Sequence, residues 1–232
     1  MGTSTNGTRE PGDRQGRISR PTVRRLSLYL RHLEDIAQQG RTTTSSRKLA
    51  DALGLTDAQV RKDLASFGQF GQPGVGYQVD RLIARLREIF GTEEVSDVVL
   101  VGVGSIGRAL LGFKGFLHKG FRFVAAFDAA AAKIGRKIGG IPVQPMEELA
   151  GTVRSKRIRL AVLAVPAPAA QEVADALCEA GIRGILNFAP IRLEVPEGIV
   201  VIPVDLAAML QQLNYFTGGG PAIRKQAPAD QS

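Results

Sequence analysis

The sequence is poor in the residues that most often carry catalysis or covalent cross-links. Its 232 residues include one cysteine, two histidines and no tryptophan. A single cysteine excludes an internal disulfide and suits a reducing compartment, so we expect the cytoplasm. No apolar run reaches the ~18 residues that a membrane span requires, and the polar amino terminus lacks the apolar core of a secretion signal. With 44% hydrophobic residues, the chain has the composition of a globular protein.

Basic charge is concentrated in the first part of the chain. Residues 1–90 contain 15 Lys and Arg against 9 Asp and Glu, whereas residues 91–232 contain 15 against 13. A basic segment joined to a nearly neutral remainder indicates contact with a polyanion such as nucleic acid. Charge alone leaves a second interpretation open, that of a solvated basic surface.

Helical periodicity predicts three helices in this basic part. Apolar positions predict a helix over 23–39 and a short helix over 46–53, separated by a polar turn. Gly54 ends the short helix, and Thr56-Asp57-Ala58-Gln59 is a capping box that opens the third. The third helix is basic on its free face. Two short helices joined by a tight glycine turn in this way form a helix-turn-helix.

A predicted β-hairpin follows the third helix directly. Four glycines and a proline lie between residues 68 and 77, before a further helix over 79–90. A hairpin in this position is a wing, so the third helix is expected in a major groove and the second helix and the wing on phosphates. The expected DNA-binding residues are Ser46, Arg47, Lys48, Gln59, Arg61, Lys62, Ser66, Gln69 and Gly74. A small helical packing module without DNA is the alternative.

A glycine-rich turn follows the first strand of the second half. The apolar strand 98–101 runs into Gly102-Val103-Gly104-Ser105-Ile106-Gly107, a G-x-G-x-x-G turn that opens a helix over 106–117. Gly102 permits a tight turn, Gly104 lets a pyrophosphate approach the backbone, and Gly107 lets the helix pack close to the strand. The alternative is a glycine-rich turn in a domain that binds no nucleotide.

An acidic residue stands at the distance that this motif requires. Asp128 lies 21 residues after Gly107, at the end of the next strand. A carboxylate there accepts hydrogen bonds from the adenine ribose hydroxyls and repels a 2′-phosphate, so NAD(H) is favoured over NADP(H). Lys133 and Arg136 lie nearby in sequence and weaken this preference.

Strand and helix patterns alternate beyond residue 92. Strands are expected at 98–101, 121–127, 160–165, 184–187 and 199–203, and helices at 106–117, 146–150 and 169–180. This α/β alternation predicts a Rossmann-type, doubly wound parallel sheet covered on both faces. A last amphipathic segment, 205–216, has no surface left to cover in its own domain. The expected organisation is a disordered tail at 1–20, a winged helix-turn-helix domain at 21–91, a Rossmann domain at 92–203, a carboxy-terminal helix at 204–216 and a disordered tail at 217–232.

Candidates for catalysis are few. His32 lies in the first predicted helix, His118 follows the helix after the glycine turn, and Cys178 lies on an apolar helical face. Each is expected to be structural or on the surface, and no metal-ligand spacing is present. A hydride-transferring enzyme usually needs an acid or base beside the nicotinamide, and none can be nominated. Two other hypotheses remain: an NAD-dependent enzyme with a basic appendage, and a structural DNA-binding protein with a degenerate nucleotide fold.

Taken together, these segments resemble the Rex family of bacterial redox-sensing transcriptional repressors. The resemblance covers about residues 20–216 and is carried by 24–31, 45–47, 55–64, 67–77 and 184–190. It implies a homodimer without enzymatic activity that binds near-palindromic operator DNA and is released by NADH, which makes NAD(H) a sensed ligand. It also implies that the carboxy-terminal helix is exchanged between subunits.

The resemblance implies two further sets of residues. Arg31 and Asp205 match a family pair that forms a salt bridge between subunits in the DNA-bound state. Phe113 and Leu206 match positions near the nicotinamide that are aromatic in some members. The implied cofactor-binding residues are Gly102, Val103, Gly104, Ser105, Ile106, Gly107, Asp128, Phe113, Val165, Pro166, Asn187, Phe188, Ala189 and Leu206.

Overall fold

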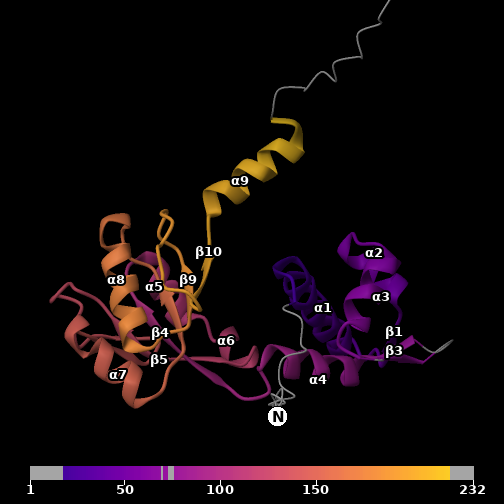
Figure 1. Ribbon diagram of the computed structural model, residues 1–232, viewed down its shortest axis with the longest axis horizontal. Helices are drawn as coiled ribbons and strands as arrows, with labels where there is room; N and C mark the ends of the chain where they lie inside the picture. Colours follow the sequence, from indigo (N-terminus) through magenta and orange to yellow (C-terminus); the bar gives the residue numbers. More distant parts are fainter. Residues whose placement is uncertain (1–17, 69, 73–75, 220–232) are drawn as a thin grey trace, which may run out of the picture. The chain divides into compact units, whose positions relative to one another are not determined.

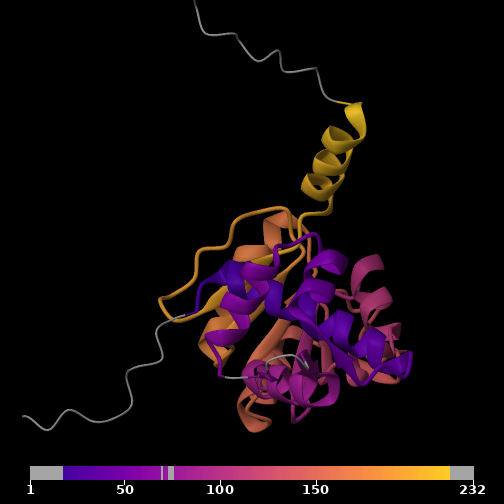
Figure 2. The same ribbon diagram turned by 90° about the vertical axis from the view of Figure 1, so that its right-hand side faces the viewer.

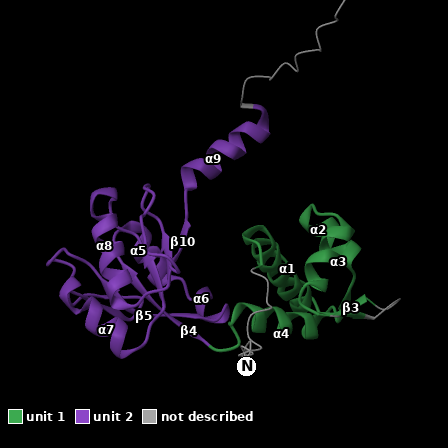
Figure 3. Ribbon diagram, viewed as in Figure 1, with its two compact units in different colours: residues 1–94 green, residues 95–232 purple. Residues whose placement is uncertain are grey.

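The computed structural model describes residues 18–68, 70–72 and 76–219, which form two compact units (Figure 3). The first unit ends at Glu94 and the second begins at Val95. The sequence placed this boundary between residues 91 and 92. Gln69 and Gly74, both expected DNA contacts, lie outside the described residues, as do most of the two expected tails. No helix in the described part of the chain is long and apolar enough to span a membrane.

The first unit is helical with a small antiparallel sheet. Its elements are α1 (Arg20–Gln38), β1 (Thr43–Thr44), α2 (Ser46–Leu53), α3 (Asp57–Ala65), β2 (Gly71–Gln72), β3 (Gly76–Gln78) and α4 (Val79–Phe90). Strand β3 lies between β1 and β2. The predicted wing hairpin corresponds to β2 and β3. The predicted polar turn before α2 was incomplete, because Thr43 and Thr44 pair with β3.

Local hydrogen bonds and Gly54 set where α2 ends and where α2 and α3 begin. The Ser45 hydroxyl accepts a hydrogen bond from Lys48 N at the start of α2, and Gly54 ends the helix in the left-handed conformation (φ 66°). The Thr56 hydroxyl accepts from Gln59 N at 3.2 Å and so caps α3. Only this half of the predicted capping box forms, because the Gln59 side chain donates to Asp63 instead.

One apolar core holds the first unit together. Residues from all four helices are buried in it: Leu26, Tyr29, Leu33, Ile36, Leu49, Ala50, Val60, Leu64, Val79, Leu82 and Leu86. The predicted inner face of α3 lies in this core, with Val60 and Leu64 buried and Phe67 packed against them. The opposite face of α3 is therefore free for a partner.

The second unit is a seven-stranded sheet with helices on both faces (Figures 1 and 2). Its strands are β4 (Ser96–Val101), β5 (Phe121–Phe127), β6 (Lys137–Ile138), β7 (Ile141–Gln144), β8 (Leu160–Leu163), β9 (Gly184–Asn187) and β10 (Val200–Pro203). The spatial order is β10-β9-β8-β4-β5-β7-β6, and all pairs but the last are parallel. The strand order reverses between β4 and β8, which is where doubly wound sheets bind ligands.

Two apolar layers cover the sheet. One face packs against α7 (Leu149–Ser155) and α8 (Ala167–Ala180) through residues such as Phe127 and Leu177. The other face packs against α5 (Ser105–Gly112) through Leu100 and Leu111. The Rossmann-type architecture predicted from the strand and helix alternation is confirmed.

Three details of the predicted second unit were wrong. The helix expected over 106–117 is broken at Phe113 into α5 and α6 (Gly115–His118), because Phe113 adopts an extended backbone (ψ 104°). The segment expected as a helix over 146–150 begins as a 3-10 turn, Met146–Glu148, and α7 then continues to Ser155. The sheet is not wholly parallel, because β6 and β7 form an antiparallel hairpin at one edge. Cys178, expected to be structural, is half-buried on α8 and packs against the core.

Candidate nucleotide and nucleic-acid sites

The glycine turn is shaped by backbone contacts that admit no side chain at two positions. Gly102 has a φ of 98°, and a Cβ there would lie 2.4 Å from Ala164 O. A Cβ at Gly107 would lie 2.1 Å from Gly102 O. Gly102 therefore lets β4 turn beside β8, and Gly107 lets α5 start against that turn.

Gly104 has a different environment from the other two glycines. Its φ is −84°, and no atom lies within 4 Å of the place that its Cβ would take. It precedes Ser105, the first residue of α5, and the first intrahelical hydrogen bond runs from Arg108 N to Gly104 O at 3.0 Å. The N–H groups of Ser105, Ile106 and Gly107 therefore have no intrahelical acceptor. Open space beside these donors suits an anionic group such as a pyrophosphate.

Asp128 lies at the end of β5 and is already engaged within the protein. Its Oδ2 accepts hydrogen bonds from Val103 N at 2.8 Å and from Lys133 Nζ at 2.7 Å, and its Oδ1 accepts from Ala130 N at 2.9 Å. Burial raises the pKa of Asp128, and the hydrogen bonds from Lys133, Ala130 and Val103 outweigh it, so the pKa lies below the ordinary 3.8. Asp128 is thus a stable carboxylate that ties the glycine turn to the strand beside it.

The lone pairs of Asp128 limit how it can hold a ribose. A carboxylate has about four lone-pair positions, and Oδ2 uses both of its own on Val103 and Lys133. Only Oδ1 retains an acceptor position. The sequence assigned the ribose diol to the carboxylate alone. The geometry instead presents a pair, because Asp128 Oδ1 has room to accept from one hydroxyl and the ammonium of Lys133 has N–H groups left over.

The ends of β8 and β9 lie at the same edge of the sheet as the glycine turn, because parallel strands end together. Asn187 is buried and serves its own loop, since its Oδ1 accepts from Ala189 N and its Nδ2 donates to Ile191 O. Phe188 packs partly into the core beneath α5. Val165 and Pro166 follow β8 and lead into α8. Asn187 therefore shapes the loop rather than offering its amide freely to a ligand.

Phe113 and Leu206 are both more than half exposed, at 60% and 56%. The Phe113 ring stacks edge-to-face on Phe116, with a centroid separation of 5.1 Å. Leu206 begins the carboxy-terminal helix α9 (Leu206–Asn214), and the Asp205 carboxylate caps this helix by accepting from Ala208 N at 2.9 Å. The predicted partner of Asp205, Arg31, is exposed on α1 in the other unit.

The predicted DNA-binding residues that are described lie on α2, on α3 or just after α3. Arg47, Lys48, Arg61, Lys62 and Ser66 are exposed, and Ser46 is half-buried. Arg61 forms an ion pair with Asp57 one turn earlier at 2.6 Å, so its charge is partly balanced within the helix. Ser66 donates its hydroxyl hydrogen to Lys62 O. These side chains form a basic, polar face that suits a phosphate backbone.

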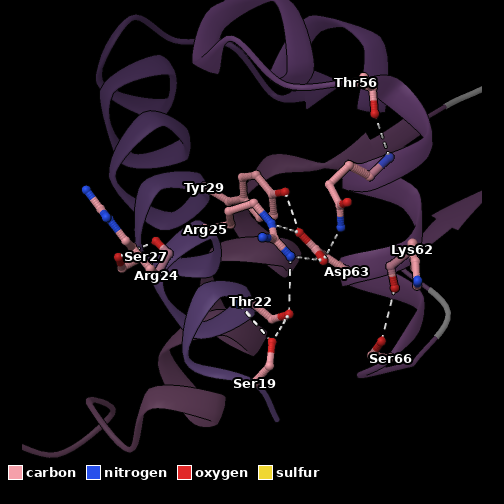
Figure 4. Close-up of polar contacts among 11 residues, drawn as sticks. Ser19, Thr22, Arg24, Arg25, Ser27, Tyr29, Thr56, Lys62, Asp63 and Ser66 are labelled. Carbon is pink, nitrogen blue, oxygen red and sulfur yellow. Dashed lines mark hydrogen bonds and ion pairs between the residues drawn. The ribbon is translucent and has the colours of Figure 1, made fainter.

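A polar cluster that the sequence patterns did not predict lies behind that face. Asp63 of α3 is only 3% exposed and accepts hydrogen bonds from the guanidinium of Arg25 and the hydroxyl of Tyr29, both on α1 (Figure 4). The position of Asp63 on the apolar inner face of α3, between the buried Val60 and Leu64, could have predicted this cluster. A charge on an inner face must be paired. This cluster joins α3 to α1 and fixes the orientation of the basic face.

Two family models match the chain in separate segments. The amino-terminal model, described as a putative DNA-binding protein N-terminus, matches residues 17–65. The second, described as a CoA binding domain, matches residues 93–191. The two matches correspond to the two units seen in the structure.

Curated relatives match over nearly their whole length. The chain is 44% identical over 200 residues to the redox-sensing transcriptional repressor Rex of Brevibacillus brevis, with 86% of this chain and 97% of the relative covered. It is 44% identical to the protein of the same name from Carboxydothermus hydrogenoformans, with 86% and 96% covered. For Rhodopirellula baltica the identity is 44% over 213 residues, with 92% and 90% covered.

Solved structures match both units as well. A crystal structure of RSP in complex with β-NAD⁺ and operator DNA superposes with a TM-score of 0.83 at 33% identity and covers 88% of this chain and 94% of that one. A structure of RSP, a Rex-family repressor, in complex with β-NADH superposes with a TM-score of 0.81 at 31% identity, with 88% and 96% covered.

Proposed function

Since this chain belongs to the Rex family of redox-sensing transcriptional repressors, we propose that it binds operator DNA as a homodimer and leaves it when NADH occupies the nucleotide site. In this proposal the protein acts in the cytoplasm, where it senses the NADH/NAD⁺ ratio. One observation carries this proposal. A basic helix-turn-helix unit and a Rossmann-type unit with a glycine-rich turn lie in one chain, and this chain matches its relatives over almost their whole length.

The residues at the carboxyl edge of the sheet fit a dinucleotide. The free N–H groups at the start of α5, beside the open space at Gly104, would hold the pyrophosphate. Asp128 and Lys133 would hold the adenine ribose. The apolar residues Phe113, Pro166 and Phe188 would border the nicotinamide, together with Val165, Ala189 and the loop that Asn187 braces.

The nicotinamide end is where the two redox states of the ligand differ. NAD⁺ carries a positive charge on a planar ring, whereas NADH is neutral there and its ring is not planar. A border of largely apolar side chains disfavours the charged ring because desolvating a charge is costly. NADH shifts the protein away from DNA only to the extent that it binds the DNA-free arrangement more tightly. A hundredfold preference corresponds to about 2.7 kcal/mol per site.

The nucleotide serves as a signal rather than as a hydride donor. Of the two histidines of the sequence, His32 belongs to the first unit, and His118 precedes β5, at the end of that strand opposite the carboxyl edge of the sheet. Burial raises the pKa of the Cys178 thiol on α8, which disfavours the reactive thiolate. Among the described residues there is no group of three or more potential metal ligands.

The carboxy-terminal helix supports the homodimer. Six large apolar side chains of α9 and the turn after it are each more than half exposed: Leu206, Met209, Leu210, Leu213, Tyr215 and Phe216. An apolar stripe of this extent is typical of an interface. The occupant that the family resemblance implies is a second copy of the chain, which exchanges this helix. In that dimer, Arg31 of one subunit and Asp205 of the other would pair while DNA is bound.

A mobility-shift assay tests the proposed function. The wild-type protein first selects duplexes from a randomised library in the presence of NAD⁺, and the selected consensus is then used as the labelled probe. We expect saturating NADH to dissociate the complex and saturating NAD⁺ to leave it intact. A complex that responds identically to both nucleotides contradicts the redox switch. Steady NADH oxidation that depends on an added substrate would support an enzyme instead.

A further inference from the structure

The Asp63 carboxylate has no acceptor position left over. It receives hydrogen bonds from Arg25 Nε at 2.6 Å and Nη2 at 2.8 Å, from the Tyr29 hydroxyl at 2.8 Å and from Gln59 Nε2 at 2.8 Å. These four donors match the roughly four lone-pair positions of a carboxylate. Figure 4 shows Arg25 and Tyr29 approaching Asp63 from α1. The carboxylate is therefore rigidly held by the helix behind it.

This arrangement determines which way the Gln59 amide faces. An ionised carboxylate only accepts hydrogen bonds, so Gln59 must present its NH₂ group to Asp63 and turn Oε1 away. Burial raises the pKa of Asp63, and the hydrogen bonds from Arg25, Tyr29 and Gln59 outweigh it, which keeps the group ionised. Within the described residues, the side chain of Gln59 makes one hydrogen bond, from Nε2 to Asp63, and its backbone N–H donates to Thr56. Its Oε1 and its second Nε2 hydrogen are left for a partner.

The remaining donor and acceptor lie on the face proposed to meet DNA. Gln59 is half-buried in the first turn of α3, and the exposed Lys62 and Ser66 follow it at spacings of three and seven residues. Residues at these spacings share one side of a helix. The first turn of a recognition helix is also the part that contacts base edges in helix-turn-helix complexes.

We propose that Gln59 recognises an adenine in each operator half-site, and that Asp63 is the positioning residue that presents its amide for this purpose. This inference rests on the proposed DNA-binding function. Adenine offers an N6–H donor beside the N7 acceptor, and these match one amide oxygen and one amide hydrogen. Guanine offers two acceptors in the same place, which the fixed Oε1 would repel. Thymine offers O4 and a methyl group, and cytosine offers a donor without the adjacent acceptor.

The experiment uses the full-length protein and the duplex selected by the wild type. Each base pair of one half-site is replaced in turn by the other three, and the affinity is measured by fluorescence anisotropy with NAD⁺ present. For the wild type we expect one A·T pair whose replacement lowers the affinity about fivefold to a hundredfold, the range for a bidentate base contact. Gln59→Ala should reduce discrimination at that pair to less than about threefold and leave the other positions unchanged.

Asp63→Asn supplies a readout that a purely structural role would not produce. When the new Nδ2 takes the Oδ1 position beside Gln59, it donates to Gln59 Oε1, so the Gln59 amide turns over and presents hydrogens outward. The preferred base at that single position should then move from adenine to guanine or thymine, which present acceptors. Arg87→Gln is the matched control, because it breaks the ion pair of 2.8 Å between Arg87 and Glu34 in the same unit and leaves Gln59 untouched.

The outcomes separate this inference from the proposed function. A wild type that selects no consensus, or ignores NADH, overturns the proposed function itself. A wild type that selects a consensus and releases it with NADH, while Gln59→Ala keeps the full discrimination profile, overturns only the role of Gln59. If Asp63→Asn fails to fold, as judged by its melting curve, Gln59→Ala still decides the question. Loss of discrimination at one A·T pair supports the inference, and the same change in Arg87→Gln contradicts it.

Discussion

Lys133 donates a hydrogen bond from its ammonium group to Oδ2 of Asp128 at 2.7 Å, at the place where the adenine ribose of a dinucleotide would lie. An acidic residue alone at this position excludes a 2′-phosphate by repulsion. The neighbouring ammonium offsets part of that charge and has donors left for a ribose hydroxyl. The pair therefore decides both how tightly the ribose is held and how strongly a 2′-phosphate is rejected.

Lys133→Gln should sharpen discrimination against NADPH. Removing the positive charge exposes the 2′-phosphate to Asp128, so the ratio of the NADPH to the NADH dissociation constant should rise about three- to tenfold, the factor for roughly 1 kcal/mol. Titration of the protein with both nucleotides, followed by fluorescence, measures this ratio. Lys156→Gln is the control, since it removes an exposed lysine from the far end of α7. An unchanged ratio in Lys133→Gln would show that the ammonium leaves the ribose site on binding.

Gly104→Ala and Gly107→Ala should fail in different ways. A methyl at Gly107 collides with Gly102 O, so this variant should lose about 1–3 kcal/mol of stability. A methyl at Gly104 meets no protein atom, so this variant should melt like the wild type. Its affinity for NADH should nevertheless fall at least about tenfold, because the methyl fills the space for the pyrophosphate. Chemical denaturation and NADH titration distinguish the two effects, and tight NADH binding by Gly104→Ala would place the pyrophosphate elsewhere.

The double variant Arg61→Ala, Lys62→Ala should lose operator binding and keep its NADH affinity. Both side chains lie on the exposed side of α3 in the first unit, whereas the nucleotide residues belong to the second. Loss of cations also releases fewer counterions, so the dependence of residual DNA affinity on salt should become shallower. Lys156→Ala, Arg159→Ala removes the same charge from the second unit and should bind the operator normally. Equal losses in the two double variants would indicate a general charge effect.

Leu210→Asp should convert the dimer to a monomer. Leu210 is 65% exposed on α9, and a charge on that stripe cannot be buried against a second copy without a large desolvation cost. Gln211→Glu adds the same charge on the opposite side of the helix and should remain dimeric. Sedimentation analysis measures the mass of each variant. A Leu210→Asp protein with the mass of a dimer would mean that α9 is not the interface.

Asp63 should give the first unit a marked acid sensitivity. Its pKa is lower in the folded protein than the ordinary 3.8. The ionised form therefore stabilises the fold fully above about pH 4, and this contribution is lost as the pH falls through the lower folded pKa. Denaturation of the wild type between pH 2 and 5 should show stability rising with pH, and Asp63→Asn should flatten this rise. The variant should also be less stable at pH 7 by about 3–5 kcal/mol, because Arg25 loses the charge of its buried partner.

Local chemistry predicted most elements of the fold because their signals lie within a few residues. Continuous apolar runs identified β4, β5 and β8. Gly54 marked the end of α2, and the Thr56 cap marked the start of α3, each within one residue of the observed position. The hairpin of β6 and β7 was missed because its strands are short and two glycines and a proline interrupt the apolar pattern. The break at Phe113 was missed because the helical spacing of apolar residues continues through it.

The sequence also predicted which residue types make up the two candidate sites, because their signals are spacings along the chain. These signals are the spacing from Gly102 to Gly107, the distance to Asp128 and the basic face of α3. Which atoms remain free for a partner was decided by the tertiary structure. Lys133 and Val103 both donate to one oxygen of Asp128. Arg25 and Tyr29, which are 38 and 34 residues away from Asp63 in the sequence, hold the Asp63 carboxylate in place, and that carboxylate orients the Gln59 amide. Hydrogen bonding saturates, so the state of each donor and acceptor depends on neighbours that only the folded chain brings together.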